Sequence, residues 1–285
     1  MTLFETLKRG EEYLARRQIP DASLDAWYLL EHLLKQEKGS LINRAWFLLN
    51  RQEETGQELL EKYEKLLEKR GSHVPLQHIT GEQEFMGLSF LINEKVLVPR
   101  QDTEILVEEA MKAAKPGMEV LDLCTGSGCI LISLMKRRPG MKGMACDLSG
   151  EALQVAEENS IRQGVDIDFR HGDLFEAVTG RFDLIVSNPP YIPTDEISHL
   201  MEEVRLFDPV MALDGGEDGL YFYRNIVSDA PGYLKDGGWL MVEIGHDQGE
   251  AVAGLLKKAG FGRVEVCKDL AGLDRVVKGR LPEKK

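Results

Sequence analysis

A short hydrophobic run ends in four residues whose types suit the binding of a planar group that carries an NH2. Residues 182–186 are mostly apolar, as expected of a buried parallel strand. The strand must stop at Asn188, because the two prolines that follow lack the N–H that a sheet ladder needs. Asn188 then lies at the carboxyl edge of an α/β sheet, where ligands bind. We expect Asn188 and the Pro189 carbonyl to accept two N–H bonds from an amide or amine. Pro189 and Pro190 would hold these acceptors in place, and Tyr191 would pack beside the planar group. The alternative is a proline-rich turn that binds no ligand.

A glycine-rich turn, Cys124-Thr125-Gly126-Ser127-Gly128, follows a predicted strand at residues 119–123. A dinucleotide-binding turn would have its third glycine at the position of Leu131, and a phosphate-binding P-loop would have a G-K-S/T sequence. Both features are missing. A tight turn that lets the backbone approach a ligand remains, and the helix N-terminus beyond it favours an anionic or carboxylate group.

Acidic residues at the ends of the next two strands extend this candidate site. Asp147 lies about 20 residues beyond the glycines, the position at which an acid accepts hydrogen bonds from a ribose. Asp173 would meet the amino group of an adenine, with Leu174 against the ring. A nucleoside without a diphosphate, such as S-adenosylmethionine, fits this pattern, and Asn188 would lie near its methyl group. An ordinary βα turn with a capping acid is the alternative.

The reaction that these residues indicate is an in-line methyl transfer from a sulfonium sulfur to a nitrogen atom. An amide nitrogen is a poor nucleophile, since its lone pair is delocalised. Positioning the nitrogen and stabilising the charge that it acquires are therefore the available means of catalysis. The sequence offers no side chain that we assign as a general base.

Alternating strands and helices from residue 117 onward would position these residues. The pattern predicts a doubly wound, mostly parallel α/β sheet of seven strands, with an antiparallel edge formed by the last two. The predicted strands are residues 119–123, 143–147, 167–171, 182–187, 239–244, 263–268 and 275–278. The predicted helices are residues 103–114, 129–138, 149–162, 196–206, 220–234 and 248–259.

The N-terminal part differs from the rest, because its apolar residues recur at helical spacing only. We predict a small helical bundle at residues 1–72, whose third helix begins at Ser40 and covers residues 41–49. A β-hairpin linker at residues 73–100 would pair residues 84–91 with 95–98 around a turn near Asn93. The catalytic domain would be residues 101–285.

The formal net charge of −13 arises from 35 Lys and Arg against 48 Asp and Glu. Residues 1–70 contribute only −1, so the rest of the chain carries −12, which disfavours direct binding to nucleic acid. The four cysteines form no C-x-x-C pair, and the six histidines share no ligand spacing, so we expect neither a disulfide nor a metal. Without a signal segment or a membrane-spanning run, a cytoplasmic protein is the expectation.

Several motifs together resemble a known family. Residues 120–128 and the Asn-Pro-Pro-Tyr sequence at 188–191 are similar to class I amino-methyltransferases. The chain resembles the release factor glutamine methyltransferases more specifically, over nearly its whole length. The segments that carry this likeness are Phe85-Met86-Gly87-Leu88, residues 98–104, residues 212–220 and Glu243-Ile244-Gly245. Two residues depart from the family pattern: Cys124 replaces a glycine, and Leu174 stands where some members have an aromatic ring.

The resemblance implies methylation of the glutamine side-chain amide in the Gly-Gly-Gln motif of peptide chain release factors, which modulates translation termination. It also implies that the N-terminal bundle helps to dock the factor, and we expect a monomer. A nucleic-acid amino-methyltransferase is the alternative, since its target base would be flipped into the same pocket. Two segments are left open. Pro99–Glu104 either borders the methionine end of the cofactor or is a plain junction, and Asp214–Gly219 borders the substrate or is merely a turn.

Overall fold

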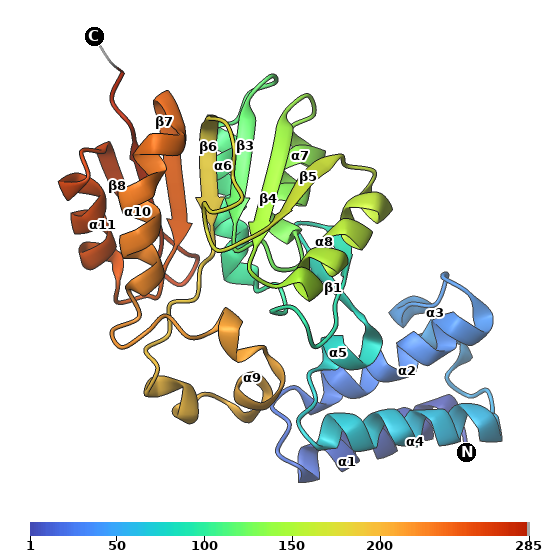
Figure 1. The fold of residues 1–285 in the computed structure, drawn as a ribbon. Coiled ribbons are helices and arrows are strands. Elements are labelled where there is room, and N and C mark those ends of the chain that lie inside the picture. Colours follow the sequence, from blue (N-terminus) through green and yellow to red (C-terminus); the bar gives the residue numbers. More distant parts are fainter. Residues whose placement is uncertain (284–285) are drawn as a thin grey trace. The chain divides into compact units, whose positions relative to one another are not determined.

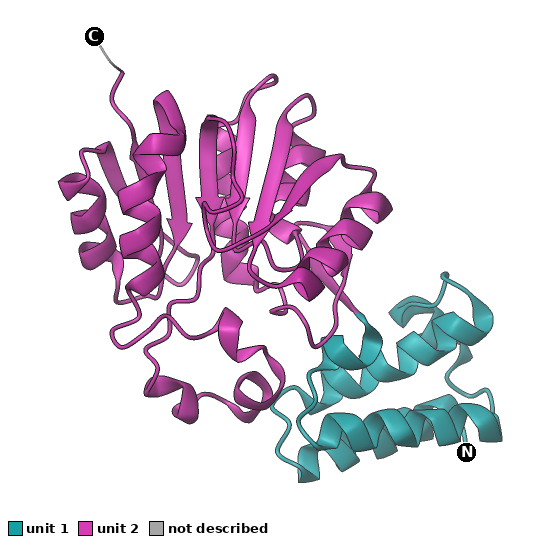
Figure 2. Ribbon diagram, in the orientation of Figure 1, with its two compact units in different colours: residues 1–81 teal, residues 82–285 magenta. Residues whose placement is uncertain are grey.

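The computed structural model describes residues 1–283, which divide into two compact units. Unit 1 is Met1–Gly81, and unit 2 begins at Glu82 (Figure 2). The boundary therefore lies later than the predicted one after residue 72. The reason is a short helix, α5 (Leu76–Thr80), which lies in the predicted linker and packs against α2 and α4 of unit 1. It ends at Gly81, whose φ of 76° stops the helix.

Unit 1 consists entirely of helices, as the sequence predicts, around a core that includes Trp27 and Tyr63. Its other helices are α1 (Leu3–Arg16), α2 (Ala22–Lys38), α3 (Arg44–Asn50) and α4 (Gln57–Gly71). The prediction for α3 was wrong about its start. Asn43 caps this helix, because its Oδ1 accepts from the Trp46 N–H (2.9 Å), so Ser40 and Leu41 stay outside.

The β-hairpin exists, but its register differs from the prediction. It pairs β1 (Glu82–Phe85) with β2 (Leu88–Leu91), and residues 95–98 form no strand. The turn is Met86-Gly87 rather than Asn93, with φ of 53° and 70°, as a two-residue hairpin turn of this hand requires. Methionine seldom adopts this conformation, which is why the sequence did not reveal it. Two side chains hold it: Glu104 Oε1 accepts from the Met86 N–H (2.5 Å), and Arg137 donates to the Met86 carbonyl.

Unit 2 contains a seven-stranded sheet in the order β5-β4-β3-β6-β7-β9-β8 (Figure 1). Its strands are β3 (Glu119–Leu123), β4 (Lys142–Asp147), β5 (Ile167–His171), β6 (Phe182–Ser187), β7 (Leu234–Glu243), β8 (Gly262–Lys268) and β9 (Asp274–Arg280). Strand β9 runs antiparallel to both its neighbours, and the other pairs are parallel. The predicted doubly wound fold with an antiparallel edge is confirmed. The strand order reverses between β3 and β6, and such a reversal is where open α/β sheets bind ligands.

Helices cover both faces of this sheet, because neighbouring residues of each strand point to opposite sides. Val120 of β3 belongs to a core with α6, α7, α8 and the hairpin, whereas Leu121 belongs to a core with α10 and α11 (Figure 1). The helices are α6 (Glu104–Ala113), α7 (Cys129–Arg137), α8 (Gly150–Gln163), α9 (Glu202–Phe207), α10 (Tyr221–Tyr233) and α11 (Gly249–Lys258). Three short 3₁₀ turns are η1 (Gln101–Thr103), η2 (Glu196–His199) and η3 (Val210–Ala212).

The predicted helix at residues 196–206 is interrupted. Leu200 and Met201 have extended ψ values of 157° and 144°, which separate η2 from α9. Neither piece has a buried residue, and Met201 and Leu206 are 63% and 54% exposed. A long helix needs a buried apolar face for most of its stability. The apolar spacing is present here, but the apolar side chains of both pieces are at most half-buried.

Candidate active site

A cavity with about 950 Å³ of empty space opens at the carboxyl ends of β3, β4, β5 and β6. The structure brings most of the predicted site residues to its wall, although they come from four different strand ends. These residues are Cys124, Thr125, Gly126, Ser127, Asp147, Asp173, Leu174, Asn188 and Pro190. We call the first seven the glycine-turn half of the cavity. Asn188 and Pro190, with Arg100 and Thr103 from the segment before α6, form the Asn188 half.

The two glycines of the turn have different environments. Gly126 has a φ of 56°, and a Cβ atom there would meet nothing within 4 Å, so its backbone is open toward the cavity. Gly128 also has a positive φ, but its Cβ would lie 2.8 Å from Ile132 Cδ1 and 3.2 Å from Ala156 Cβ. Gly128 does not line the cavity. It therefore permits the close packing of α7 on α8 rather than the approach of a ligand.

Cys124, which replaces a glycine of the family pattern, has a φ of 57°. This left-handed conformation explains why glycine is the usual residue at this position. Burial is the main cause that raises the pKa of the Cys124 thiol well above its ordinary value, with the nearby Asp147 carboxylate adding to it. The thiol is thus neutral and acts as a small side chain on the cavity wall.

Backbone N–H groups hold the carboxylate of Asp147 in place. Gly126 N–H donates to Asp147 Oδ2 (2.8 Å), and Ser149 N–H donates to Oδ1 (2.9 Å). Burial raises the pKa of Asp147, and these backbone hydrogen bonds oppose the rise. Each carboxylate oxygen can accept a further bond, so the group is oriented and still able to bind a hydroxyl.

A second acid, which the sequence reasoning did not assign, lies beneath the turn. Asp122 of β3 is fully buried, and its Oδ2 accepts from Thr125 Oγ1 (2.6 Å). The pKa of Asp122 is raised to about 7, mainly by burial and also by the charge of Asp147, although the hydrogen bond from Thr125 opposes the rise. Its other oxygen, Oδ1, has no hydrogen-bond partner among residues 1–283. Asp122 thus links the glycine turn to β3 by a hydrogen bond, while the burial of its carboxyl group costs desolvation free energy.

Side chains from distant parts of the sequence surround Asn188. Its Nδ2 lies 3.4 Å from Thr103 Oγ1, and its amide also lies beside the carboxyl of Glu243 at the end of β7. Burial raises the pKa of Glu243 to about 7, whereas the Thr103 hydroxyl, Arg275 and Asn188 favour the charged form. The strand before Asn188 is fixed by Ser187 Oγ, which donates to the Leu123 carbonyl of β3 (2.8 Å).

Two of the four predicted residues at the end of β6 lie off the cavity wall. Pro189 is buried, and the half-buried Tyr191 packs against the core below α10 and α11. Burial raises the pKa of the Tyr191 phenol to about 12. The contact that we predicted between the Tyr191 ring and a planar substrate is therefore not evident from its position, and it stays a prediction.

Residues 214–219, whose role the sequence left open, pack against the backbone that follows Asn188. Gln248 Nε2 donates to the carbonyls of Tyr191 (2.9 Å) and Gly219 (3.3 Å), which joins the two segments. Gly215 N–H donates to the Ile192 carbonyl (2.8 Å), and a Cβ on Gly215 would lie only 2.7 Å from Tyr191 Cα. The glycine-rich loop is thus a packed support for the backbone that follows Asn188.

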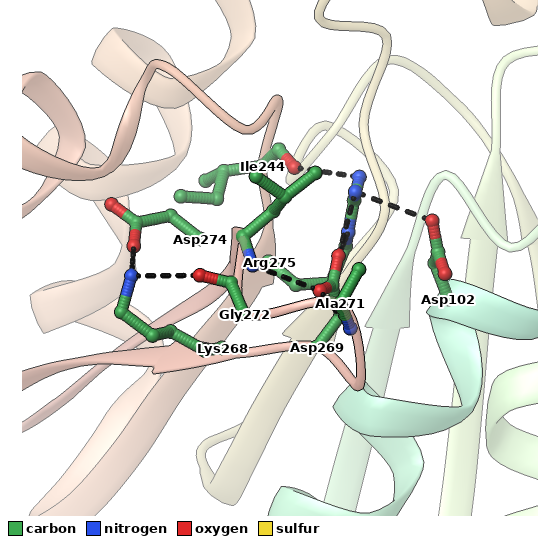
Figure 3. Close-up of polar contacts among 9 residues, drawn as sticks. Asp102, Ile244, Lys268, Asp269, Ala271, Gly272, Asp274 and Arg275 are labelled. Atoms are coloured by element: carbon green, nitrogen blue, oxygen red, sulfur yellow. Dashed lines mark hydrogen bonds and ion pairs between the residues drawn. The ribbon is translucent and has the colours of Figure 1, made fainter.

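The segment at residues 99–104 borders the cavity, and two arginines anchor it. Arg100 Nη2 donates to Asp208 Oδ2 (2.7 Å), and Arg275 Nη2 lies 3.2 Å from Asp102 Oδ2. Figure 3 shows Arg275 between Asp102 and the turn that carries Asp269, which it also pairs with at 3.0 Å. Thr103, the residue before α6, makes no capping hydrogen bond and lines the cavity.

Residues 1–283 contain no group of three or more His, Cys, Asp or Glu side chains that could hold a metal ion. No helix among these residues is long and apolar enough to cross a membrane.

Comparison with known proteins identifies the family. Residues 5–81 match the family described as the PrmC N-terminal domain, and residues 100–205 match the methyltransferase small domain. The chain is 42% identical over 281 residues to the release factor glutamine methyltransferase of Geobacter sulfurreducens, covering 98% of this chain and 97% of the relative. It is 43% identical over 284 residues to that of Cereibacter sphaeroides, with 99% of each chain covered.

The chain belongs to the release factor glutamine methyltransferase family. The family resemblance predicted from its motifs is confirmed, and the two matched segments fall on the helical unit and on the sheet that carries the cavity. The crystal structure of a methyltransferase from Pyrococcus furiosus has the same fold, with a TM-score of 0.54 and 19% identity over 69% of this chain and 90% of that one.

Proposed function

We propose that this protein transfers a methyl group from S-adenosylmethionine to the side-chain amide nitrogen of the glutamine in the Gly-Gly-Gln motif of peptide chain release factors. Methylation would modulate translation termination. The observation that carries the proposal is that Asn188 shares one cavity with the glycine turn and Asp147. The printed names of the family relatives, release factor glutamine methyltransferases, support the substrate class.

The glycine-turn half fits the proposed cofactor. The backbone of Gly126 is open to the cavity, and the oriented carboxylate of Asp147 suits the two hydroxyls of a ribose. Asp173 and Leu174 line the same wall, where we assign them to the amino group and the ring of the adenine. S-adenosylmethionine, when bound, supplies a methyl group that is activated by the sulfonium sulfur.

The Asn188 half fits an amide acceptor. We assign one acceptor of the glutamine N–H groups to Asn188 Oδ1, which is on the cavity wall and would orient the nitrogen. The second acceptor in this proposal is the Pro189 carbonyl, which lies off that wall, so the amide would have to reach past Asn188 to it. The two prolines restrict this backbone, and Gln248 holds the carbonyl of Tyr191 just beyond it (2.9 Å). These acceptors also stabilise the positive charge that develops on the nitrogen, so positioning and electrostatics replace a general base in this proposal. The C–S bond to the methyl group would break as the N–C bond forms, S-adenosylhomocysteine would leave, and the methylated amide would lose one N–H proton to water.

The two units would divide the task of substrate recognition. Unit 2 carries the whole cavity, so the residues that we assign to the chemistry all lie beyond Gly81. We therefore assign unit 1 to docking of the release factor. Since the substrate is a translation factor, we place the reaction in the cytoplasm.

A methylation assay with labelled S-adenosylmethionine tests the proposal. The purified protein is incubated with an unmodified release factor, with the same factor carrying alanine in place of the motif glutamine, with duplex DNA and with ribosomal RNA. Label is expected only in the unmodified factor. Label in nucleic acid alone would overturn the proposal. Calorimetric titration with S-adenosylmethionine is a parallel test, since the absence of binding would exclude the methyl transfer as well.

A further inference from the structure

Three side chains from different segments meet beside the end of β6. Thr103 is the last residue of η1, Asn188 follows β6, and Glu243 is the last residue of β7. Strands β6 and β7 are paired in parallel with Ser187 opposite Val242, so Asn188 and Glu243 leave the sheet side by side. Thr103 and Glu243 are only 3% and 2% exposed, and Glu243 does not line the cavity.

An asparagine amide has an acceptor end and a donor end, and its neighbours decide which end faces them. Asn188 Nδ2 donates to Thr103 Oγ1, which lies 3.4 Å away. When Glu243 is ionised, its carboxylate can only accept hydrogen bonds, and the Thr103 hydroxyl and the Asn188 amide are the donors beside it. With Glu243 ionised, both neighbours of Asn188 are therefore acceptors, which favours its NH2 group toward them and its Oδ1 toward the cavity.

Arg275 fixes the two residues that flank this arrangement. Its Nη1 donates to the carbonyl of Ile244, which follows Glu243 (3.4 Å), and its Nη2 pairs with Asp102, which precedes Thr103 (3.2 Å). Asp269 accepts from the same guanidinium (3.0 Å), so the arginine has an acidic partner on both sides (Figure 3). The segments that carry Thr103 and Glu243 are therefore held to each other independently of Asn188.

We propose that Glu243 and Thr103 are positioning residues for the methyl transfer, because they fix the amide of Asn188 with its acceptor oxygen directed at the substrate nitrogen. This inference rests on the proposed function. If the amide were reversed, its NH2 would face the N–H groups of the glutamine, and the acceptor that orients the nitrogen would be lost. Neither residue touches the transferred methyl group in this scheme, so both act through Asn188.

A double-mutant cycle separates this role from a structural one. Glu243→Gln keeps the shape of the side chain but adds an NH2 donor, which no longer favours one orientation of Asn188. We expect kcat for release factor methylation to fall about tenfold to a hundredfold, with the Kd for S-adenosylmethionine unchanged within a factor of about two. In the Asn188→Ala background, the same change should lower kcat less than about twofold, because the group that it orients is absent.

Thr103→Val, measured with and without Asn188→Ala, provides a second, independent double-mutant cycle. It tests the positioning role even if the Glu243→Gln variant does not fold. Glu109→Gln is the matched control, since it removes another buried carboxylate of unit 2 that lies outside the cavity wall, and its kcat should stay unchanged. An equal loss of kcat with and without Asn188 would overturn the inference. A wild-type protein that methylates no release factor would instead contradict the proposed function, so the two failures are distinguishable.

Discussion

The two halves of the cavity are held by different kinds of contact. In the glycine-turn half, backbone N–H groups of Gly126 and Ser149 fix the carboxylate of Asp147, and all of these residues lie within one β3–α7–β4 unit and the turn after it. In the Asn188 half, side chains hold side chains: Thr103 and Glu243 lie beside Asn188, and they come from opposite ends of unit 2.

This difference predicts which half of the cavity determines cofactor affinity and which half determines turnover. A half made of local backbone contacts is preformed by the fold, and it suits a cofactor that is the same in every turnover. A half made of side-chain contacts between distant segments sets which end of the Asn188 amide faces the cavity. This orientation matters for the reacting nitrogen. Changes in the first half should therefore alter cofactor affinity, and changes in the second should alter turnover.

The largest effect is expected for Asn188→Ala. It removes the oriented acceptor, and the loss of one preorganised hydrogen-bonding group typically lowers kcat by about 10²–10³. The measurement is single-turnover methylation of the release factor at saturating S-adenosylmethionine, with the Kd for the cofactor determined by calorimetry. If turnover stayed near normal while the cofactor bound normally, the Asn188 half would have no role in the chemistry.

Asp147→Asn should produce the opposite pattern. The substitution keeps the size of the side chain but removes its charge and one of its acceptors, so hydrogen bonds to ribose hydroxyls weaken. Hydrogen bonds to charged groups contribute about 1.5–3 kcal/mol, so the Kd for S-adenosylmethionine should rise about tenfold to a hundredfold. At saturating cofactor, kcat should fall less than about threefold. A large loss of kcat with unchanged cofactor affinity would erase the distinction between the two halves.

The third prediction concerns Asp122, whose raised pKa links stability to pH. Its folded pKa of about 7 exceeds the ordinary value of 3.8, so folding carries no ionisation penalty below pH 4 and the full penalty above pH 7. Asp122→Asn should remove this penalty, which is on the order of 4 kcal/mol, and so stabilise the protein at pH 8, with little effect at pH 4. Thermal unfolding at both pH values measures it.

Glu109→Gln is the control of opposite sign for this experiment. Burial raises the pKa of Glu109, but hydrogen bonds from Lys112 and Lys278 outweigh it and lower the pKa overall. Its ionised form therefore stabilises the fold above pH 5, and the substitution should lower Tm at pH 8. If Asp122→Asn also lowered Tm at pH 8, the carboxylate beneath the glycine turn would be stabilising, contrary to our interpretation.

The smallest effect is expected for Gly215→Ala. The added Cβ would lie 2.7 Å from Tyr191 Cα and 2.8 Å from its carbonyl carbon, closer than real Cβ atoms approach other atoms, so the backbone that carries the Asn-Pro-Pro-Tyr sequence must shift. We expect kcat to fall several-fold at an unchanged cofactor Kd, since catalytic geometry is sensitive to such shifts. Gly254→Ala in α11 is the matched control, because nothing lies within 4 Å of its Cβ. Its kcat should be unchanged, and its Tm should rise slightly because alanine favours a helix.

Much of the glycine-turn half could be predicted from sequence because its parts are local. Strands β3 and β5 occupy the predicted residues, and Gly126 and Asp147 follow their strands at a spacing that the fold dictates. Gly128 was assigned to the cofactor because it belongs to the same turn. Its packing against Ile132 and Ala156 depends on how α7 meets α8, which local sequence does not specify.

In the Asn188 half, the sequence predicted Asn188 and Pro190 and left the role of residues 99–104 open. Thr103, Glu243 and Arg275 are far apart in the sequence, and they meet because β6 lies between β3 and β7, an order that alternation alone does not define. One signal was present nevertheless. Glu243 is an acid at the last position of a buried strand, the same pattern that identified Asp147, and it would have suggested a second group at this edge.

The hydrogen bond from Ser187 to the Leu123 carbonyl has a mechanical consequence. Leu123 and Ser187 are also partners in the β3–β6 ladder, so the glycine turn and Asn188 start from two points that a sheet holds about 4.8 Å apart. In the proposed reaction, the sheet would therefore set the distance between the sulfonium sulfur and the receiving nitrogen. Movement of the loops around the cavity would leave this distance unchanged, because two paired strands hold it.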